Sequence, residues 1–558
     1  MTLTRTHRWV GLWLALAALL AWLLWPWRWM PVYPDEIAMR LSNFRFGIDH
    51  GMGGGLWSLC AGPRAVPAPL IPAAWILGQI GLHVPPQALR IPVLLLSLAA
   101  ALAAAALPAL EGREAPASIV LGGVLGVAGS SLVLLRPEAF LTLELLTGLL
   151  GVIGCRAQRL VPVLRGALLA AIALSMQLAV YVHPEGVILF PFLAIVVAGL
   201  LRPWMAFVPA CMVAVALAVL YAGAGFWMWH GNCAAYPGIE HFWKAMLPDA
   251  QPLRSTTAFA AWFSAKLSSQ YANFGFVGHY AIGYLPSLGA VPEIPRDLLN
   301  VGIDIALTLL ALRVCVAVVR NVGLACKPQN WFGWSQPRGG VAWSAPWLFL
   351  SIAVPAALLM LVDVQDAFYR SHWVVLASAL ALAVEAASDR PQGPRQTDRQ
   401  LRRLGVVLLV ALAVGSGLAV RAWVEPELRN GYAGPGLPLT SDWSASARAV
   451  RELEARLGLT AQSGGIVVDD LTYISLRAHP RLQAITYLGL QSKLTGLSIP
   501  RIMRRTGYDA VIARCRAMQA QRLPIAYRDG TICASTLQDI DSLAAARTSP
   551  RAEVGSAH

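Results

Sequence analysis

Charged residues are scarce in this 558-residue chain, where they make up 13% of the sequence against 57% hydrophobic residues. Soluble domains carry roughly 25% charged residues, so the composition excludes an ordinary soluble protein. It indicates that most of the chain faces lipid or other apolar helices. The formal net charge is +14, but the basic residues lie mostly in short connections between apolar runs. That distribution is typical of a membrane protein and argues against a nucleic-acid partner.

Several common ligand-binding motifs are also missing. The stretch "GMGGG" at 51–55 lacks the Lys-Ser/Thr ending of a phosphate-binding loop and is interpreted as a flexible linker. No CxxC or His/Cys spacing predicts a zinc site. Acidic clusters could hold a divalent cation, but no ligand spacing demands one, so the metal and cofactor remain unassigned. The chain has no inverted-repeat symmetry of the kind that marks a secondary transporter.

Apolar runs long enough to cross a membrane, which takes ~20 residues, recur along the chain. Arginines concentrate in the short connections 156–165 and 390–403, whereas the short connections on the opposite side contain Arg136 and Arg370. By the positive-inside rule, this asymmetry places the N-terminus in the cytoplasm and, after eleven spans, the C-terminal segment outside. The predicted spans are 9–30, 88–110, 118–135, 139–155, 166–182, 184–201, 204–228, 301–320, 343–362, 371–388 and 404–423.

The sequence therefore predicts a mainly α, polytopic membrane protein with a small soluble α/β domain at its C-terminus. The transmembrane module covers residues 1–424, with long outer loops at 31–87 and 229–300. An extracytoplasmic domain follows at 425–540. Residues 541–558, which are rich in Ala and Ser, are predicted to form a disordered tail.

Local patterns predict several elements outside the spans. The first outer loop is expected to open with a juxtamembrane helix lying in the membrane interface. "PLIPAAWILGQIGLHVPP" is too short to span and is expected to form an interfacial or re-entrant helix. Near the C-terminus, "DWSASARAVRELEARLGL" predicts an amphipathic helix, and "GIVVDD", "GYDAVIARC" and "YRDGTICAS" predict three strands.

Four of the eight cysteines lie in segments predicted to be outside, namely Cys60, Cys233, Cys515 and Cys533. An oxidising outer compartment would allow disulfides. A bond between Cys515 and Cys533, within the small domain, is the favoured pairing, and unpaired buried thiols are an equal alternative.

Charged motifs gather at the predicted outer ends of the helices, whereas the cytoplasmic ends carry arginines and little organised acid. Ionisable groups at membrane depth are costly and by default indicate function. Together these motifs would line a polar pocket beneath the loop 229–300. They are "YPDE" (Asp35, Glu36), "LRPEAF" (Arg136, Glu138), "YVHPEG" (His183, Glu185) and "DVQDAFYRSHW" (Asp363, Asp366, Arg370, His372).

Transfer of a sugar from a lipid phosphate would use such a set of residues. A polyprenyl phosphate is a good leaving group, so the reaction needs a carboxylate that takes the acceptor's proton and cations that hold the departing phosphate. Asp35 opens a helix after a proline, where the helix dipole favours the ionised carboxylate. Arg136 and Arg370 match phosphate bidentately. His183 and His372 are weaker candidates for the same role.

Each motif also has a purely structural interpretation. Asp35 and Glu36 could cap an exposed helix, and Arg136 with Glu138 could form a local ion pair. "YVHPEG" could simply end a helix, and Arg370 could anchor its helix at the interface. In the late outer loop, Asp363 and Asp366 are expected to be solvated. At the end of "GIVVDD", Asp469 and Asp470 could bind a ligand, although a role in a turn is favoured.

The plan as a whole resembles the GT-C superfamily of membrane glycosyltransferases, which includes the protein O-mannosyltransferases and the lipid A aminoarabinose transferases. "YPDEIAMR" after the first span is similar to the family's first-loop signature, with Asp35 at the position of the catalytic base. "LLRPEAF" and "YVHPEG" are similar to its second and third outer motifs, and "AFYRSHWVV" to its late phosphate-binding motif. The loop after the first motif departs from the aminoarabinose branch, so donor and acceptor stay open.

The resemblance implies an inverting hexosyl- or pentosyltransferase in a bacterial inner membrane. It would move a sugar from a polyprenyl-phosphate-linked donor to a lipid, glycan or protein acceptor on the extracytoplasmic face. Asp35 would act as base, and Glu36 or Glu138 would orient it or bind a cation. Two other classes stay open: a transporter or flippase that uses the same charged cavity without chemistry, and a glycan polymerase or ligase of a different membrane fold.

Overall fold

The computed structural model describes residues 66–83, 86–109, 137–156, 160–182, 184–231 and 443–548, the last range with short gaps between 461 and 495, together with a few isolated residues elsewhere. The chain divides into two compact units. One contains residues 1–31, 87–224 and 246–439, and the other contains 32–86, 225–245 and 440–558. The predicted spans 9–30, 118–135, 301–320, 343–362, 371–388 and 404–423 lie largely or wholly outside the described residues, as does the juxtamembrane helix.

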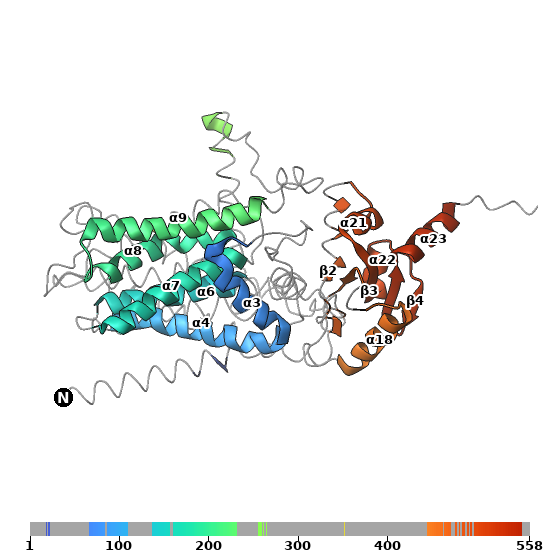
Figure 1. Cartoon of the computed structure of the whole chain (residues 1–558), viewed down its shortest axis with the longest axis horizontal. Helices are drawn as coiled ribbons and strands as arrows, with labels where there is room; N and C mark the ends of the chain where they lie inside the picture. Colours follow the sequence, from blue (N-terminus) through green and yellow to red (C-terminus); the bar gives the residue numbers. More distant parts are fainter. Residues whose placement is uncertain are drawn as a thin grey trace, which may run out of the picture. The chain divides into compact units, whose positions relative to one another are not determined.

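The described part of the first unit is helical (Figure 1). Helices stand where the hydropathy of the sequence predicts them, within a few residues at each end. Two of them, α7 and α9, are long and apolar enough to cross a membrane by length and composition, and α4, α6 and α8 contain shorter apolar stretches. The elements are α4 (Pro86–Ala109), α6 (Pro137–Arg156), α7 (Pro162–Val182), η4 (Pro184–Leu189), α8 (Phe190–Leu201) and α9 (Phe207–Gly231).

The predicted span 184–201 differs from its prediction in its first six residues. They form the 3₁₀ helix η4, and the α-helix α8 begins at Phe190. Pro184 explains the break, because proline has no backbone N–H and its ring clashes with the preceding helical turn. The result is a tight corner between α7 and α8.

Helix α6 packs closely against both α7 and α8, and three glycines permit it. A side chain at Gly148 would collide with Phe192 and lie 2.9 Å from Leu193 of α8. Along the same face, Gly151 meets Ile172 and Val196, and Gly154 meets Leu168 and Leu200. From Gly151 to Gly154, the contacting residue on α7 moves backward in sequence, from Ile172 to Leu168. The contacting residues on α8 move forward instead. Helix α6 therefore runs antiparallel to α7 and parallel to α8. Small residues allow this approach of backbones in membrane bundles.

Helix α9 presents an apolar surface to its surroundings. Its exposed side chains include Val208, Met212, Val219 and Phe226. A helix that is apolar around most of its circumference belongs in lipid or in a large core. The outer surface of α9 therefore has the character of a lipid-facing helix.

The predicted interfacial segment forms the short 3₁₀ helix η3 (Ala68–Leu70) followed by α3 (Ile71–His83). Thirteen residues span about 20 Å at 1.5 Å per residue, which is less than the ~30 Å hydrocarbon core. Trp75 is 60% exposed, and an indole at a membrane surface prefers the headgroup level. The length and this residue agree with an interfacial helix.

The C-terminal part of the second unit contains a sheet and helices that form an α/β domain (Figure 1). Its five-stranded sheet has the order β2-β1-β3-β5-β4, with β1 parallel to both β2 and β3 and with β5 antiparallel to β3 and β4. Buried strands in the parallel part read as continuous apolar runs. The strands are β1 (Gly465–Val468), β2 (Leu482–Ala484), β3 (Tyr508–Arg514), β4 (Tyr527–Asp529) and β5 (Ile532–Thr536).

Helices cover both faces of this sheet. Val511 and Ala513 of β3 belong to a core cluster with residues of α21 (Ile499–Thr506), α22 (Cys515–Ala520) and α23 (Leu537–Thr548). The alternate residues Ala510 and Ile512 are also fully buried, and successive side chains of a strand point to opposite faces. Helix α18 (Trp443–Arg456), which contacts β3, β4 and β5, supplies the buried Val450 and Leu453.

Two predictions for this domain need correction. "YRDGTICAS" forms a hairpin of two strands, β4 and β5, because Gly530 adopts a positive φ of 57° in the two-residue loop, as such turns require. The folded domain also continues to Thr548, beyond the predicted end at residue 540. Helix α23 is held there by an ion pair of Asp541 with Arg504 and by contacts with β3 and β5. Residues 549–558 of the predicted tail lie outside the described residues.

A disulfide joins Cys515 and Cys533, which decides between the two alternatives that the sequence left open. It connects the start of α22 to β5, next to the register pair Ala513–Cys533.

The glycine packing of α6 predicts a local stability difference. Gly148→Ala is expected to destabilise the bundle by about 1–3 kcal/mol, since the added methyl group overpacks against Phe192 and Leu193. Gly223→Ala in α9 is the matched control, because nothing lies within 4 Å of the added methyl group. Thermal unfolding of the purified protein in detergent measures both. Equal midpoints for the two variants would contradict the close packing.

The disulfide predicts a chemical protection pattern. In the full-length protein purified from native membranes, Cys515 and Cys533 are expected to resist a maleimide reagent until a reductant is added, and then both should react under denaturing conditions. Mass spectrometry of the labelled peptides measures this. Cys211, a free thiol in α9, serves as internal control because denaturation alone should expose it.

Candidate functional site

The sequence-predicted site residues fall mainly outside the described part of the chain. For two of them, Glu138 in the first turn of α6 and Glu185 in η4, the backbone is described and the side chain is not. The remaining six lie outside the described residues: Asp35, Glu36, Arg136, His183, Arg370 and His372. Their assignment as catalytic or substrate-binding residues stays a prediction.

The structure does bring two of the predicted motifs to one end of the bundle. Because α6 and α7 are antiparallel, the first turn of α6 and the last turn of α7 lie at the same end. "LRPEAF" enters α6, and "YVHPEG" leaves α7 and forms the corner η4. Helix α6 and η4 are also in contact with one another. Two segments nearly fifty residues apart in sequence are therefore neighbours.

The corner at η4 is pressed directly onto α7. A side chain at Gly186 would lie 2.6 Å from backbone atoms of Ala179 and Val180. Only glycine fits at such a distance, because an added β carbon would push the two backbones apart. Gly186 thus fixes where "YVHPEG" lies against the last turns of α7.

Polar side chains are buried between the helices below this corner. The hydroxyl oxygens of Thr147 (α6) and Ser175 (α7) are 2.8 Å apart, and each hydroxyl can also donate to a carbonyl in its own helix. On the opposite side of α7, the amide nitrogen of Gln177 donates to the hydroxyl of Tyr221 (α9) at 2.9 Å. Buried hydrogen bonds between helices of this kind specify which faces meet.

The most unusual buried group in the described bundle is Glu144 in α6. Its side chain has no solvent exposure, and within the described bundle neither carboxyl oxygen has a hydrogen-bond partner. A buried polar group of this kind requires an explanation, such as a bound ligand or a functional role. Glu144 is not among the site residues predicted from the sequence. A single carboxylate inside the predicted apolar span 139–155 would have indicated it.

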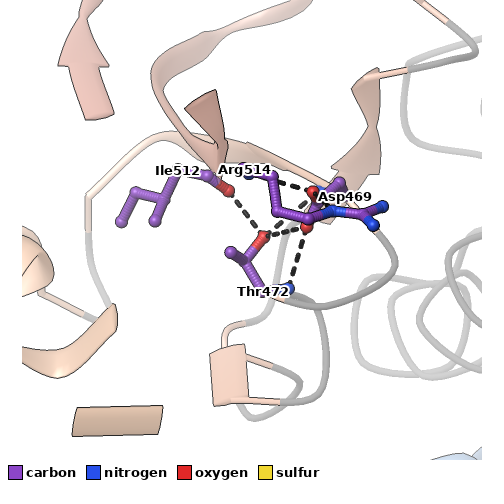
Figure 2. A network of polar contacts seen from close by, with 4 residues as sticks. All are labelled: Asp469, Thr472, Ile512 and Arg514. Carbon is purple, nitrogen blue, oxygen red and sulfur yellow. Dashed lines mark hydrogen bonds and ion pairs between the residues drawn. The ribbon is translucent and has the colours of Figure 1, made fainter. Parts of the chain in front are cut away.

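In the C-terminal domain, Asp469 forms the centre of a polar network (Figure 2). One of its carboxylate oxygens accepts hydrogen bonds from the backbone N–H of Arg514 at 2.9 Å and from its Nε at 2.7 Å. The other accepts the backbone N–H of Thr472 at 3.0 Å. The hydroxyl of Thr472 donates to the carbonyl of Ile512 at 2.6 Å. Both carboxylate oxygens of Asp469 therefore accept hydrogen bonds from groups of the same domain.

This network lies at the carboxyl ends of the adjacent parallel strands β1 and β3. In the order β2-β1-β3 the chain leaves β1 toward one side and later returns on the other, and open α/β sheets bind ligands at such switch points, beyond the carboxyl ends of the strands. Asp469 follows β1 and Arg514 ends β3, so their ion pair closes the switch point. The structural role that the sequence favoured for Asp469 is the one observed. Asp470 lies outside the described residues.

Metal ligands are not gathered in the part of the chain that the structure describes. Among those residues, no group of three or more His, Cys, Asp or Glu side chains could hold an ion. The acidic motifs that prompted the question of a divalent cation belong largely to residues outside this part. The metal and cofactor therefore stay unassigned.

Comparison with known proteins finds similarity only among solved structures. No protein-family model matches the chain, and no curated protein sequence matches it. The chain is similar to the crystal structure of ArnT from Cupriavidus metallidurans bound to undecaprenyl phosphate, with 12% identity and a TM-score of 0.41 over 95% of this chain and 98% of that one. The apo state of ArnT matches with 13% identity and a TM-score of 0.35 over 96% and 98%.

Both TM-scores are below 0.5, and the alignments carry no argument about individual residues, substrate or topology.

The Asp469 network predicts a large stability effect with a matched control. Asp469→Asn is expected to destabilise the C-terminal domain by about 3–5 kcal/mol, since it breaks an ion pair whose side chains are 15% and 3% exposed. Asp541→Asn breaks a pair that is 57% and 49% exposed and should cost less than about 1 kcal/mol. Hydrogen–deuterium exchange of β1 and β3 in the full-length protein measures both. Equal exchange would refute the central role of Asp469.

Proposed function

We propose that this protein is an integral membrane glycosyltransferase of the GT-C type. It moves a sugar from a polyprenyl-phosphate-linked donor to a lipid, glycan or protein acceptor on the extracytoplasmic face. The observation that carries the proposal is the antiparallel packing of α6 and α7, which brings the segments that bear "LRPEAF" and "YVHPEG" to one end of the bundle. Charged motifs far apart in sequence are expected to meet at one end if they form a single site.

The proposed chemistry assigns a role to each predicted motif. Asp35 removes the proton from the acceptor hydroxyl as that oxygen attacks the anomeric carbon, and the bond to the phosphate oxygen breaks with inversion. Arg136 and Arg370 hold the departing phosphate, with His183 and His372 in support. Glu36 and Glu138 orient the base or hold a cation, and Glu185 contacts the substrate.

Two observations support the proposed side of the membrane. The Cys515–Cys533 disulfide is suited to an oxidising compartment, as expected if the C-terminal domain lies in the periplasm. The compact unit that contains this domain also includes residues 32–86 and 225–245. These ranges overlap the two predicted outer loops, which supports the proposal that all three segments lie on one side of the membrane.

A transporter or flippase is the second candidate, and one observation favours it. Arg90 in α4 and Glu144 in α6 are both fully buried within apolar helices. Ionisable groups inside spans are a feature of substrate and proton pathways. A transferase and a transporter are separated by whether a glycosidic bond is made.

The transferase proposal predicts the effect of changing the base. Asp35→Asn is expected to reduce sugar transfer by about two to four orders of magnitude, as loss of a general base does, with normal protein abundance and accumulation of the lipid-linked donor. The assay uses membranes with lipid-phosphate sugars extracted from the native host. Asp363→Asn, at a position expected to be solvated, is the control. Transfer by Asp35→Asn at the wild-type rate would make Asp35 a helix cap, and no transfer by wild type would favour the transporter.

A further inference from the structure

Glu144 occupies a defined place in the packing of α6. It is four residues before Gly148 and seven before Gly151, so all three lie on one face of the helix at 100° per residue. Gly148 faces α8, and Gly151 faces both α7 and α8. Glu144 therefore points toward the groove between these two helices.

The same register places Glu144 directly under the η4 corner. Contacts pair Gly148 with Phe192 and Gly151 with Val196 of α8, and one further turn brings Glu144 level with Leu189. On α7, the pairing of Thr147 with Ser175 continues to Ala179. Residues at this level are apolar and buried, which explains why no described side chain donates a hydrogen bond to the carboxyl group.

A carboxyl group in this position is costly unless something completes its hydrogen bonds. Loss of water from a buried polar group without partners costs about 1–3 kcal/mol, and more for a charged group. Neither carboxyl oxygen has a partner among the described residues. An ionised carboxylate only accepts hydrogen bonds, so the missing partner of an ionised Glu144 carries hydrogen-bond donors. Among the described residues, the short 3₁₀ segment η4, a weaker helical form, contacts α6 between the level of Glu144 and the end of the bundle where the two motif segments lie.

We propose that Glu144 is a further substrate-binding residue, whose carboxyl group accepts hydrogen bonds from hydroxyl groups of the sugar carried by the lipid-linked donor. This inference rests on the proposed function and deepens it. Sugar hydroxyls are the donor-rich part of such a substrate, whereas its ionised phosphate offers only acceptors and would be repelled by an ionised carboxylate. Glu144 thus distinguishes a lipid phosphate that carries a sugar from one that does not.

The competing interpretation is that Glu144 is a buried orphan with no ligand. The two interpretations predict the same effect of Glu144→Leu on stability and different effects on binding of the donor. Replacement of an unpartnered buried polar group by an apolar one of similar size is neutral or stabilising, so both expect an unchanged or higher midpoint of thermal unfolding. Only the binding role expects this more stable variant to lose affinity for the sugar-bearing donor.

The test measures ligand-induced stabilisation of the full-length protein in lipid nanodiscs, since a ligand that binds the folded state raises the unfolding midpoint. One probe is undecaprenyl phosphate, and the other is the pool of lipid-phosphate sugars extracted from the native host. Glu144→Leu and Glu144→Gln are compared with wild type. Gln177→Leu is the control, because it removes a buried polar group that faces α9.

The proposal expects Glu144→Leu to bind the sugar-bearing lipids roughly 10- to 100-fold more weakly, as loss of hydrogen bonds to a charged group does, and to bind undecaprenyl phosphate as wild type does. Glu144→Gln, which keeps one acceptor oxygen, should fall between, and the control should match wild type with both probes. Equal binding of both probes by wild type and Glu144→Leu would overturn the proposal. An equal loss for both probes would also overturn it.

Failure of the proposed function gives a different pattern. If wild type binds the sugar-bearing lipids but transfers no sugar, the transferase fails, and the comparison of probes still decides the role of Glu144. If wild type shows no preference for the sugar-bearing lipids over undecaprenyl phosphate, the role of Glu144 is overturned, whether or not sugar transfer is observed.

Discussion

The close approach of α6 to α7 and α8 is the constraint on which the described bundle depends. Three glycines, at positions 148, 151 and 154, leave room for the side chains of the neighbouring helices. Because lipid offers no hydrophobic force that drives helices together, such packing and the hydrogen bond between Thr147 and Ser175 supply the association. This contact sets the direction of α7 relative to α6 and hence brings the segments of "LRPEAF" and "YVHPEG" to one end of the bundle.

The corner at η4 fixes where the chain that leaves α7 lies against this packing. Pro184 ends the regular helix, and Gly186 lets the next turn lie against the backbone of α7. Glu144 lies beneath that corner with its carboxyl oxygens unpartnered among the described residues. A carboxylate kept there against its cost of burial has the character of a functional residue rather than a structural one, whichever membrane activity the protein has.

In contrast to Glu144, the buried carboxylate of the C-terminal domain is fully hydrogen-bonded. Asp469 is surrounded by donors from Arg514 and Thr472, so the place where a related sheet would bind a ligand is closed by the protein's own side chains. The disulfide at Cys515 adds a covalent link beside it. Both features make the domain a rigid module, which agrees with bracing or docking rather than with catalysis at this sheet edge.

Much of the secondary structure could be predicted from the sequence, because hydropathy over about 20 residues is a strong signal. The helices α4, α6, α7 and α9 begin and end within a few residues of the predicted spans. The short strands β2 and β4 were missed, since three residues carry almost no pattern and are stabilised only by their neighbours. Most of helix α23 was assigned to a tail because its Ala- and Ser-rich sequence is weakly amphipathic, and the ion pair of its Asp541 with Arg504 of α21 is a tertiary contact.

The sequence by itself determined that the chain is apolar, which segments form helices, and where charged motifs stand relative to them, because these depend on local composition. Tertiary structure alone decided that α6 and α7 are antiparallel neighbours, that Glu144 is enclosed without donors while Asp469 is fully hydrogen-bonded, and that Cys515 pairs with Cys533. These properties depend on residues that are distant along the chain, and the energy of a buried charge is set by what packs around it. A carboxylate in an apolar span and one after a strand look alike in sequence and differ only once their surroundings are known.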